Sequence, residues 1–292
     1  MKILCLHGIL SSGALFEFQT GAFRKLLGED HEYIFTDGEI EVKDQSDSAA
    51  QFRWTRNAGP SDIQSAHEYI RAVIEEDGPF QGVIGFSDGA AMAASIILQH
   101  ETNKLDQPPP FKFAILFSCP LVSSPDKEFA KEFYEATYNR SSAEMFKAMD
   151  VSVQEFPGRS GDVDLVADGL DQSSRDVVVK ELWEATATTQ SELRMQIGLE
   201  ESQVLVKDTE SLPKIYHPAL LSQRVRIPTA CITGSNDFKA VQMTQELFDK
   251  RNTKIVVHSG GHNLPKQAND LKNAVAAAKW AIRQSQLTIN QR

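Results

Sequence analysis

The sequence predicts an α/β protein with a mostly parallel, open β-sheet flanked by helices. Short apolar runs that end in Gly, Asp, Ser or His alternate with amphipathic stretches of helical length, a pattern typical of βαβ units. With 41% hydrophobic and 24% charged residues among 292, the composition is that of a globular protein and excludes disordered, collagen-like and coiled-coil chains. The length alone permits one large α/β domain or two smaller ones.

The expected strands are short apolar runs bounded by turn residues. They are Lys2–Leu6, Glu32–Thr36, Gly82–Gly85, Lys112–Phe117, Thr229–Thr233 and Lys254–His258. Amphipathic spacing predicts helices between them, at Ala14–Leu27, Ser61–Glu76, Gly89–Gln99, Ala240–Lys250 and Gln267–Gln284. Pro60 stands where the second of these helices begins, as helix capping favours.

One interval, from Val122 to Arg226, is far longer than a βα crossover needs. Within it we expect helices at about Pro125–Thr137, Ser141–Met149 and Arg175–Thr188. Since structureless loops of this length are uncommon in compact domains, the sequence predicts a single domain over 1–292 with a helical cap inserted at 122–226.

Charge and hydropathy exclude two classes of partner. A net charge of −10 disfavours binding to nucleic acid by phosphate neutralisation. The longest apolar runs, Ala90–Leu98 and Phe113–Val122, are too short to cross a bilayer, so no membrane partner is expected. His7 interrupts the apolar amino-terminal run, which disfavours a signal peptide. The sparse cysteines form no CxxC pair, so we expect a cytoplasmic protein without disulfides or a metal site; they are Cys5, Cys119 and Cys231.

The segment Gly85-Phe86-Ser87-Asp88-Gly89 matches G-x-S-x-G, directly after a predicted strand and before an alanine-rich helix. A sharp turn between strand and helix exposes the central residue at the carboxyl edge of the sheet, and the glycines let neighbouring backbone pass close by. Ser87 is therefore the candidate nucleophile. A solvated serine in a glycine-rich turn is the alternative that the motif leaves open.

A serine hydroxyl is a weak nucleophile unless an imidazole takes its proton and an acid orients that imidazole. In α/β-hydrolases these groups follow one another as Ser, Asp and His. Asp237 follows the predicted strand Thr229–Thr233, and His262 follows Lys254–His258. Both would reach the edge where Ser87 stands, although Asp237 also suits an ordinary turn.

Other titratable residues fit structural roles better. His258 lies inside a strand, and His217 belongs to the insertion as a surface or cap residue. Asp208 and Asp249 suit solvated positions. His7 follows the first strand and is expected to be buried and to hold the next loop.

An oxyanion that forms on the substrate needs two backbone N–H donors. One donor comes from the residue after the nucleophile, here Asp88, and the second comes from a loop that follows a strand. After the first strand, Ile9 is the preferred second donor, and Leu10 is the alternative.

With these residues assigned, the chain resembles the fungal family serine hydrolases, the FSH group of α/β-hydrolases. The matching segments are ILCLHGILSSGALFEFQT, GVIGFSDGAAMAA, IPTACITGSNDF and VVHSGGHNLP. The first of them looks most like members that accompany fungal polyketide synthases and release acyl chains from a carrier protein. The resemblance implies Ser87 as nucleophile, Asp237 as acid and His262 as base.

The chain departs from the family pattern at three places. Asp88 replaces the more frequent glutamine beside the nucleophile, Phe238 replaces a frequent proline after Asp237, and the insertion is largely unmatched. The turn Gly85–Gly89, called the elbow below, keeps the backbone N–H of Asp88, so the oxyanion hole is still expected. The identity of the acyl group does not carry over from the resemblance.

The expected function is therefore hydrolysis of an ester or thioester through an acyl-serine, without metal or organic cofactor. An acyltransferase or macrolactone-forming cyclase on the same residues, a non-catalytic binding protein and a peptidase are the alternatives. An acyl carrier protein is a candidate partner, but such proteins are usually acidic, so docking against a net charge of −10 needs a local basic patch. Candidates for it in the insertion are Lys127, Lys131, Arg140 and Lys147.

Overall fold

The computed structural model describes residues 1–28, 30–42, 50–103, 106–140, 151–153, 170–197, 204–206 and 211–289. Within them, a six-stranded parallel sheet has the order β10-β9-β6-β5-β1-β2. Its strands are β1 (Lys2–Leu6), β2 (Glu32–Thr36), β5 (Gly82–Phe86), β6 (Phe113–Phe117), β9 (Thr229–Gly234) and β10 (Thr253–His258). Each corresponds to a predicted strand, and the predicted α/β fold class is confirmed.

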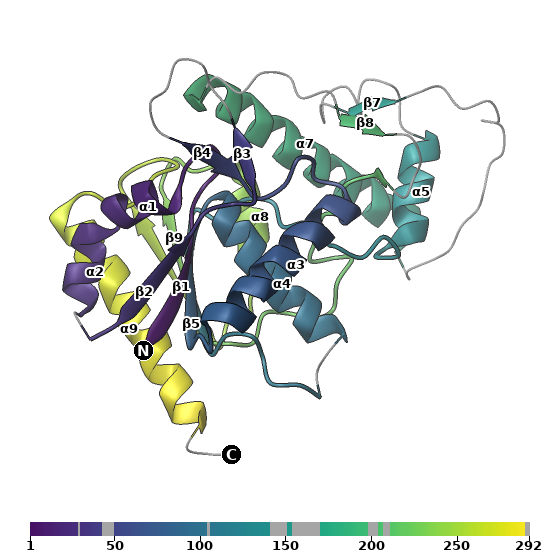
Figure 1. Ribbon diagram of the computed structural model, residues 1–292. Coiled ribbons are helices and arrows are strands. Elements are labelled where there is room, and N and C mark those ends of the chain that lie inside the picture. The colour runs from purple at the N-terminus through teal and green to yellow at the C-terminus, as the bar shows by residue number, and fades with distance from the viewer. Residues whose placement is uncertain are drawn as a thin grey trace.

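Helices cover both faces of the sheet, as Figure 1 shows. One face packs against α1 (Gly13–Gln19), α2 (Gly21–Leu27) and α9 (Ala268–Ile289). The other face packs against α3 (Pro60–Asp77) and α4 (Asp88–Asn103). Central strands buried on both faces explain the continuous apolar runs in the sequence.

Alternate residues of one strand enter the two different cores. In β1, Ile3 and Cys5 pack under α1, α2 and α9, while Leu4 and Leu6 pack under α3 and α4. All four side chains are fully or almost fully buried. A parallel arrangement brings the carboxyl ends of the strands to one edge, where the loops carry function.

Two of the helices predicted between the strands of the main sheet differ from those observed. The predicted helix Ala14–Leu27 is divided at Thr20, whose hydroxyl donates to the Phe16 carbonyl at 2.7 Å. The predicted helix Ala240–Lys250 is shorter in the structure, α8 (Lys239–Gln245). The residues after it turn to pair with Val225, which exchanges backbone hydrogen bonds with Leu247 and Asp249.

A hairpin that the sequence analysis did not predict lies beside the first loop. Its strands β3 (Ile40–Val42) and β4 (Gln51–Arg53) are antiparallel. Phe52 also donates its N–H to the Ser11 carbonyl at 2.7 Å. The hairpin is thereby attached to the loop that follows β1.

The interval between β6 and β9 contains α5 (Lys131–Arg140), β7 (Val151–Val153), α7 (Gln172–Ile197) and β8 (Val204–Val206) among the described residues. The predicted helix Ser141–Met149 lies outside them. The predicted helix Pro125–Thr137 begins later, after Ala130, whose φ of +45° is not helical. Figure 1 shows α7 on the side of the sheet where the strands end.

Specific contacts attach this interval to the α/β core. The Tyr134 hydroxyl donates to the Ile215 carbonyl at 2.7 Å and accepts from its N–H at 2.8 Å. At the end of the interval, Arg226 forms an ion pair with the buried Glu101 of α4. These contacts fix both α5 and the return of the chain to β9.

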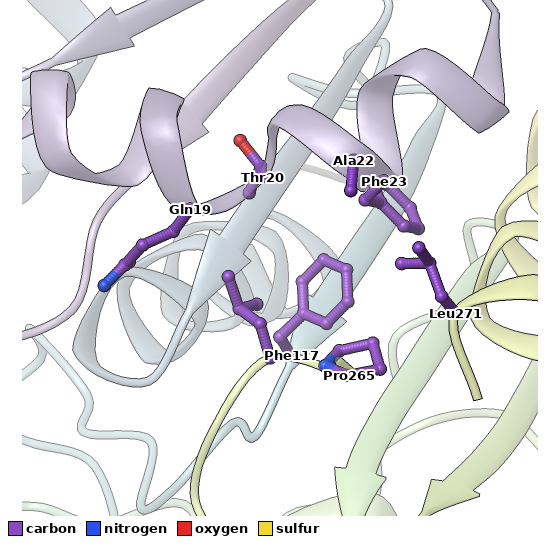
Figure 2. A pocket seen from close by; sticks show the side chains of 8 residues that line it. Gln19, Thr20, Ala22, Phe23, Phe117, Pro265 and Leu271 are labelled. Carbon is purple, nitrogen blue, oxygen red and sulfur yellow. The ribbon is translucent and has the colours of Figure 1, made fainter. Parts of the chain in front are cut away.

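A small cavity of about 20 Å³ lies between α2, the end of β6 and the segment before α9. Figure 2 shows that Phe23, Phe117 and Leu271 line it. Its size is that of roughly one water molecule. It is therefore a packing gap and not a substrate pocket.

The sequence predicted no membrane-spanning helix and no disulfide, and the described residues bear on both expectations. No helix among them is long and apolar enough to span a bilayer. Cys5, Cys119 and Cys231 are all free and buried. A cytoplasmic location stays a prediction.

Candidate active site

Ser87 occupies a strained turn between β5 and α4. Its φ is +52°, in the left-handed region that residues with a Cβ rarely adopt. The Ser87 N–H donates to the Phe117 carbonyl at 2.9 Å, which ties the turn to β6. A Cβ at Gly85 would lie 2.6 Å from the Ala90 Cα, and one at Gly89 would collide with the Leu6 carbonyl. The two glycines are therefore required for the close approach of strand and helix.

The three residues expected to act together are in hydrogen-bond contact. His262 Nε2 lies 2.7 Å from Ser87 Oγ, and His262 Nδ1 lies 2.7 Å from Asp237 Oδ1. Because an ionised carboxylate only accepts, Nδ1 carries the proton and Nε2 accepts from the serine hydroxyl. Ser87 is 5% and His262 7% exposed. The geometry suits proton transfer from Ser87 to His262.

Asp237 accepts further hydrogen bonds besides the one from His262. Ser118 Oγ donates to Oδ2 at 2.6 Å, the Gly234 N–H donates to Oδ2 at 3.1 Å, and the Phe238 N–H donates to Oδ1 at 2.9 Å. Burial opposes ionisation, but the hydrogen bonds from His262 and Ser118 outweigh it and lower the pKa of Asp237. Asp237 is therefore a carboxylate at neutral pH, held in one orientation.

Two aromatic rings surround His262. The Phe238 ring is stacked on the imidazole, with centroids 3.9 Å apart and planes 8° apart. Phe86 lies farther away, at 5.5 Å and 36°. Phe238 is 1% exposed, so its ring forms part of the packed environment of His262.

The loop with the expected oxyanion donor is held by His7. The Gly38 N–H donates to His7 Nε2 at 2.9 Å, so the ring proton is on Nδ1, which donates to the Gly8 carbonyl at 2.6 Å. The Gly8 carbonyl and the Ile9 N–H belong to one planar peptide and point in opposite directions. His7 thus fixes the direction of the Ile9 N–H. The prediction that His7 is buried and holds this loop is confirmed.

The residue that directly follows strand β4 supports the same loop. Trp54 Nε1 donates to the His7 carbonyl at 2.8 Å, and its ring lies 4.8 Å from the His7 ring. Burial lowers the pKa of His7, which keeps the imidazole neutral and preserves this pattern of donors and acceptors. Leu10, the alternative donor, has a φ of +50°, so this loop is also strained.

Asp88 contributes both a backbone N–H and an unusual carboxyl group. It begins α4, where the N–H groups of the first turn have no helical acceptor. Burial raises the pKa of its side chain to about 6, and the nearby Arg53 charge opposes this shift. The residue beside Ser87 therefore changes charge close to neutral pH.

The competing histidines and acids lie elsewhere. His258 is buried in β10 and accepts from the Gly260 N–H at 3.1 Å. His217 is 4% exposed and contacts Glu181 of α7, so of the two expected positions the surface one is wrong, and the side chain is buried within the inserted interval. Asp249 pairs with Arg251, and Asp208 lies outside the described residues.

Sequence reasoning missed Ser118 and the stacked ring of Phe238. Ser118 directly follows β6, the strand between β5 and β9, so its place at the carboxyl edge was a usable signal. The contact between Phe238 and His262 depends on how two loops pack, which no local pattern encodes. No cluster of metal-ligating side chains occurs within the part of the chain that the structure describes.

Comparison with known proteins gives the family. Residues 1–155 match the family described as Serine hydrolase (FSH1). Over 98% of both chains, the protein is 31% identical to Esterase alnB of Emericella nidulans. The chain belongs to the FSH1 family of serine hydrolases. The expected family and the expected enzyme class, a serine hydrolase, are thereby confirmed.

More distant relatives cover most of the chain as well. Hydrolase FUB4 of Fusarium oxysporum is 26% identical, over 93% of this chain and 94% of its own. Serine hydrolase cnsH of Penicillium expansum is 25% identical, over 80% and 90%. Among solved structures, a carboxylesterase from Mesorhizobium loti aligns over 97% of this chain and 88% of its own, with 11% identity and a TM-score of 0.45.

Proposed function

We propose that this serine hydrolase cleaves an ester or thioester through an acyl-Ser87 intermediate, with His262 as general base and Asp237 as the orienting acid. The observation that carries the proposal is the hydrogen-bond chain from Asp237 through His262 to Ser87, with both distances 2.7 Å. The similarity to an esterase over 98% of the chain supports the same substrate class.

The reaction follows from the roles of these atoms. Ser87 Oγ attacks the substrate carbonyl carbon while its proton moves to His262 Nε2. The resulting oxyanion accepts hydrogen bonds from the Ile9 and Asp88 N–H groups, each contributing about 10²–10³ in rate. His262 returns the proton to the departing alcohol or thiol. Water then attacks the acyl-serine, with His262 again as base, and releases the carboxylic acid.

The finer substrate assignment rests on the sequence resemblance. We propose an acyl or polyketide chain on a carrier protein as the natural substrate. Electrostatic docking of an acidic carrier is opposed by the net charge of −10. Of the candidate basic residues, Lys131 is already paired with Glu128 at 3.1 Å, while Lys147 and the side chain of Arg140 lie outside the described residues.

We also propose that residues 122–226 act as a cap over this site. Ala185 of α7 packs with Phe238 and with Val241 of α8, and α7 lies on the side where the strands end (Figure 1). An inserted element in this position suits substrate binding between α7 and the sheet edge.

The test of the nucleophile is Ser87→Ala. The variant should fold, lose labelling by a fluorophosphonate and lose at least about 10³-fold in esterase activity. Ser285→Ala is the matched control, since Ser285 is buried in α9 and bonds only to the Ile282 carbonyl among the described groups. Undiminished labelling of Ser87→Ala would overturn the proposal.

The substrate assignment has a separate test. The same acyl group is presented on a carrier protein and as an N-acetylcysteamine thioester, and products are identified by mass. A higher kcat/KM for the carrier-bound form supports carrier recognition, and equal values contradict it. Free acid supports hydrolysis, whereas a lactone or ester product would assign acyl transfer instead.

A further inference from the structure

Phe238 contacts both partners of the proposed nucleophile activation. Its N–H donates to Asp237 Oδ1 at 2.9 Å, and its ring is stacked on His262 with centroids 3.9 Å apart and planes 8° apart. A proline at this position would have neither the N–H nor an aromatic face. The two contacts therefore depend on this residue being phenylalanine.

The ring of Phe238 packs against the inserted interval. Ala185 of α7 packs in the same buried cluster as Phe238, together with Ala240 and Val241 of α8. Phe238 is 1% exposed, so in a close-packed site its ring cannot rotate away without displacing these neighbours. The stacking on His262 is accordingly a fixed feature of the site.

Stacking has a different strength in the two protonation states of the imidazole. The face of a benzene ring carries partial negative charge, which attracts a cation that lies over it. Neutral His262 in the free enzyme gains only packing from this face, but the imidazolium formed as Ser87 attacks gains electrostatic attraction as well. An interaction that is stronger in the transition state than in the ground state raises kcat.

We propose that Phe238 is a positioning residue for the base, which fixes the plane of the His262 ring and stabilises its imidazolium form during acyl transfer. The ring of Phe238 is stacked on His262, so it acts through His262. Because Phe238 packs with Ala185 of α7, the inserted interval is connected to the base through Phe238. The proposal rests on the catalytic roles proposed for Ser87 and His262.

The decisive variant is Phe238→Leu, which keeps a buried apolar side chain and removes the ring face. Phe248→Leu is the matched control, because Phe248, at 2% exposed, is as deeply buried as Phe238 but belongs to the core under α3 and α4. Both variants should lose similar thermal stability. Only Phe238→Leu should slow fluorophosphonate labelling of Ser87, by about tenfold, within the range of a desolvated cation–π contact.

Two further readouts separate this role from a merely structural one. With p-nitrophenyl butyrate, Phe238→Leu should lower kcat and leave KM unchanged, because the lost interaction forms only in the transition state. Phe238→Tyr keeps the aromatic face and should retain kcat within about threefold of wild type, although the added hydroxyl lowers stability. If Phe238→Leu does not fold, Phe238→Met takes its place in the same comparison.

The outcomes are distinguishable from those of the proposed function. Equal labelling rates for the two leucine variants, or a tyrosine variant as slow as Phe238→Leu, would overturn the role of Phe238. Absence of Ser87 labelling in the wild-type protein would overturn the proposed function instead.

Discussion

Replacing Ser118 by alanine and by glycine separates two properties of this one residue. Its hydroxyl donates to Asp237 Oδ2 at 2.6 Å, and its backbone has a φ of +48°. A residue with a Cβ costs roughly 1–2 kcal/mol in this conformation, whereas glycine adopts it freely. Alanine removes the hydrogen bond and keeps the strain, while glycine removes both.

The magnitudes follow from these two contributions. A hydrogen bond to a charged group contributes about 1.5–3 kcal/mol to stability, so Ser118→Ala should lose an amount in that range. Ser118→Gly should recover about 1 kcal/mol of it because the strain is relieved. Both variants lose the same donor to Asp237 and should therefore fall by the same factor in kcat/KM, about tenfold.

The assay is urea unfolding of the three proteins at pH 7, combined with the rate of fluorophosphonate labelling. The Asp237 carboxylate has a lowered pKa, so its contribution to stability is present above the ordinary carboxyl pKa of 3.8 and is lost as the pH falls through the lower folded value. The difference between wild type and Ser118→Ala is thus fully developed at pH 7. A glycine variant no more stable than the alanine variant would refute the strain argument, and unchanged labelling in both would refute a role in orienting Asp237.

Two other substitutions test the elbow. Gly89→Ala should prevent correct folding because its Cβ would meet the Leu6 carbonyl, whereas Gly21→Ala, which meets nothing within 4 Å in α2, should gain up to about 1 kcal/mol in unfolding free energy. Folded yield and circular dichroism compare them, and a well-folded, active Gly89→Ala would contradict the close approach. Asp88→Asn should be about 2 kcal/mol more stable than wild type at pH 7.5, because burial raises the pKa of Asp88 to about 6 and penalises its charged form. That advantage should fall to roughly half at pH 5, where folded Asp88 is protonated but the unfolded carboxyl is still mostly ionised, and it should vanish below the ordinary carboxyl pKa of 3.8. A difference independent of pH would contradict the raised pKa.

The sheet was predictable from the sequence because its strands carry local signals. Apolar runs such as Lys2–Leu6 and Glu32–Thr36 end in turn residues, and their observed bounds equal the predicted ones. The elbow was predictable for the same reason. Its two glycines lie within five residues, and each is required because a Cβ there would collide with neighbouring backbone. Asp237 and His262 were located by their position after strands, which parallel topology converts into spatial proximity.

Contacts between distant segments were not predictable in this way. The hairpin of β3 and β4 reaches the site through Trp54 and the His7 carbonyl, 47 residues apart. Each of its strands has only three residues, too few to show alternation. Ser118 and Asp237 are 119 residues apart; the end of β6 places Ser118 at the carboxyl edge, but no local pattern specifies its hydrogen bond to Asp237.

The interval between β6 and β9 was the least well predicted region because its structure depends on contacts between distant segments and not on local signals. Its helix α5 begins only after Ala130, and its position depends on Tyr134 bonding to Ile215, 81 residues later. Burial of His217 likewise depends on α7, through Glu181. Periodicity finds such helices but not their partners, because the face that a helix buries is decided by segments far away in the chain. Since Phe238 packs with Ala185 of α7 and is stacked on His262, this region of weak local signal also contacts the residue that we propose positions the base. Specificity and base positioning should therefore vary together among chains that differ in this interval, while the elbow and the strands that carry it stay the same.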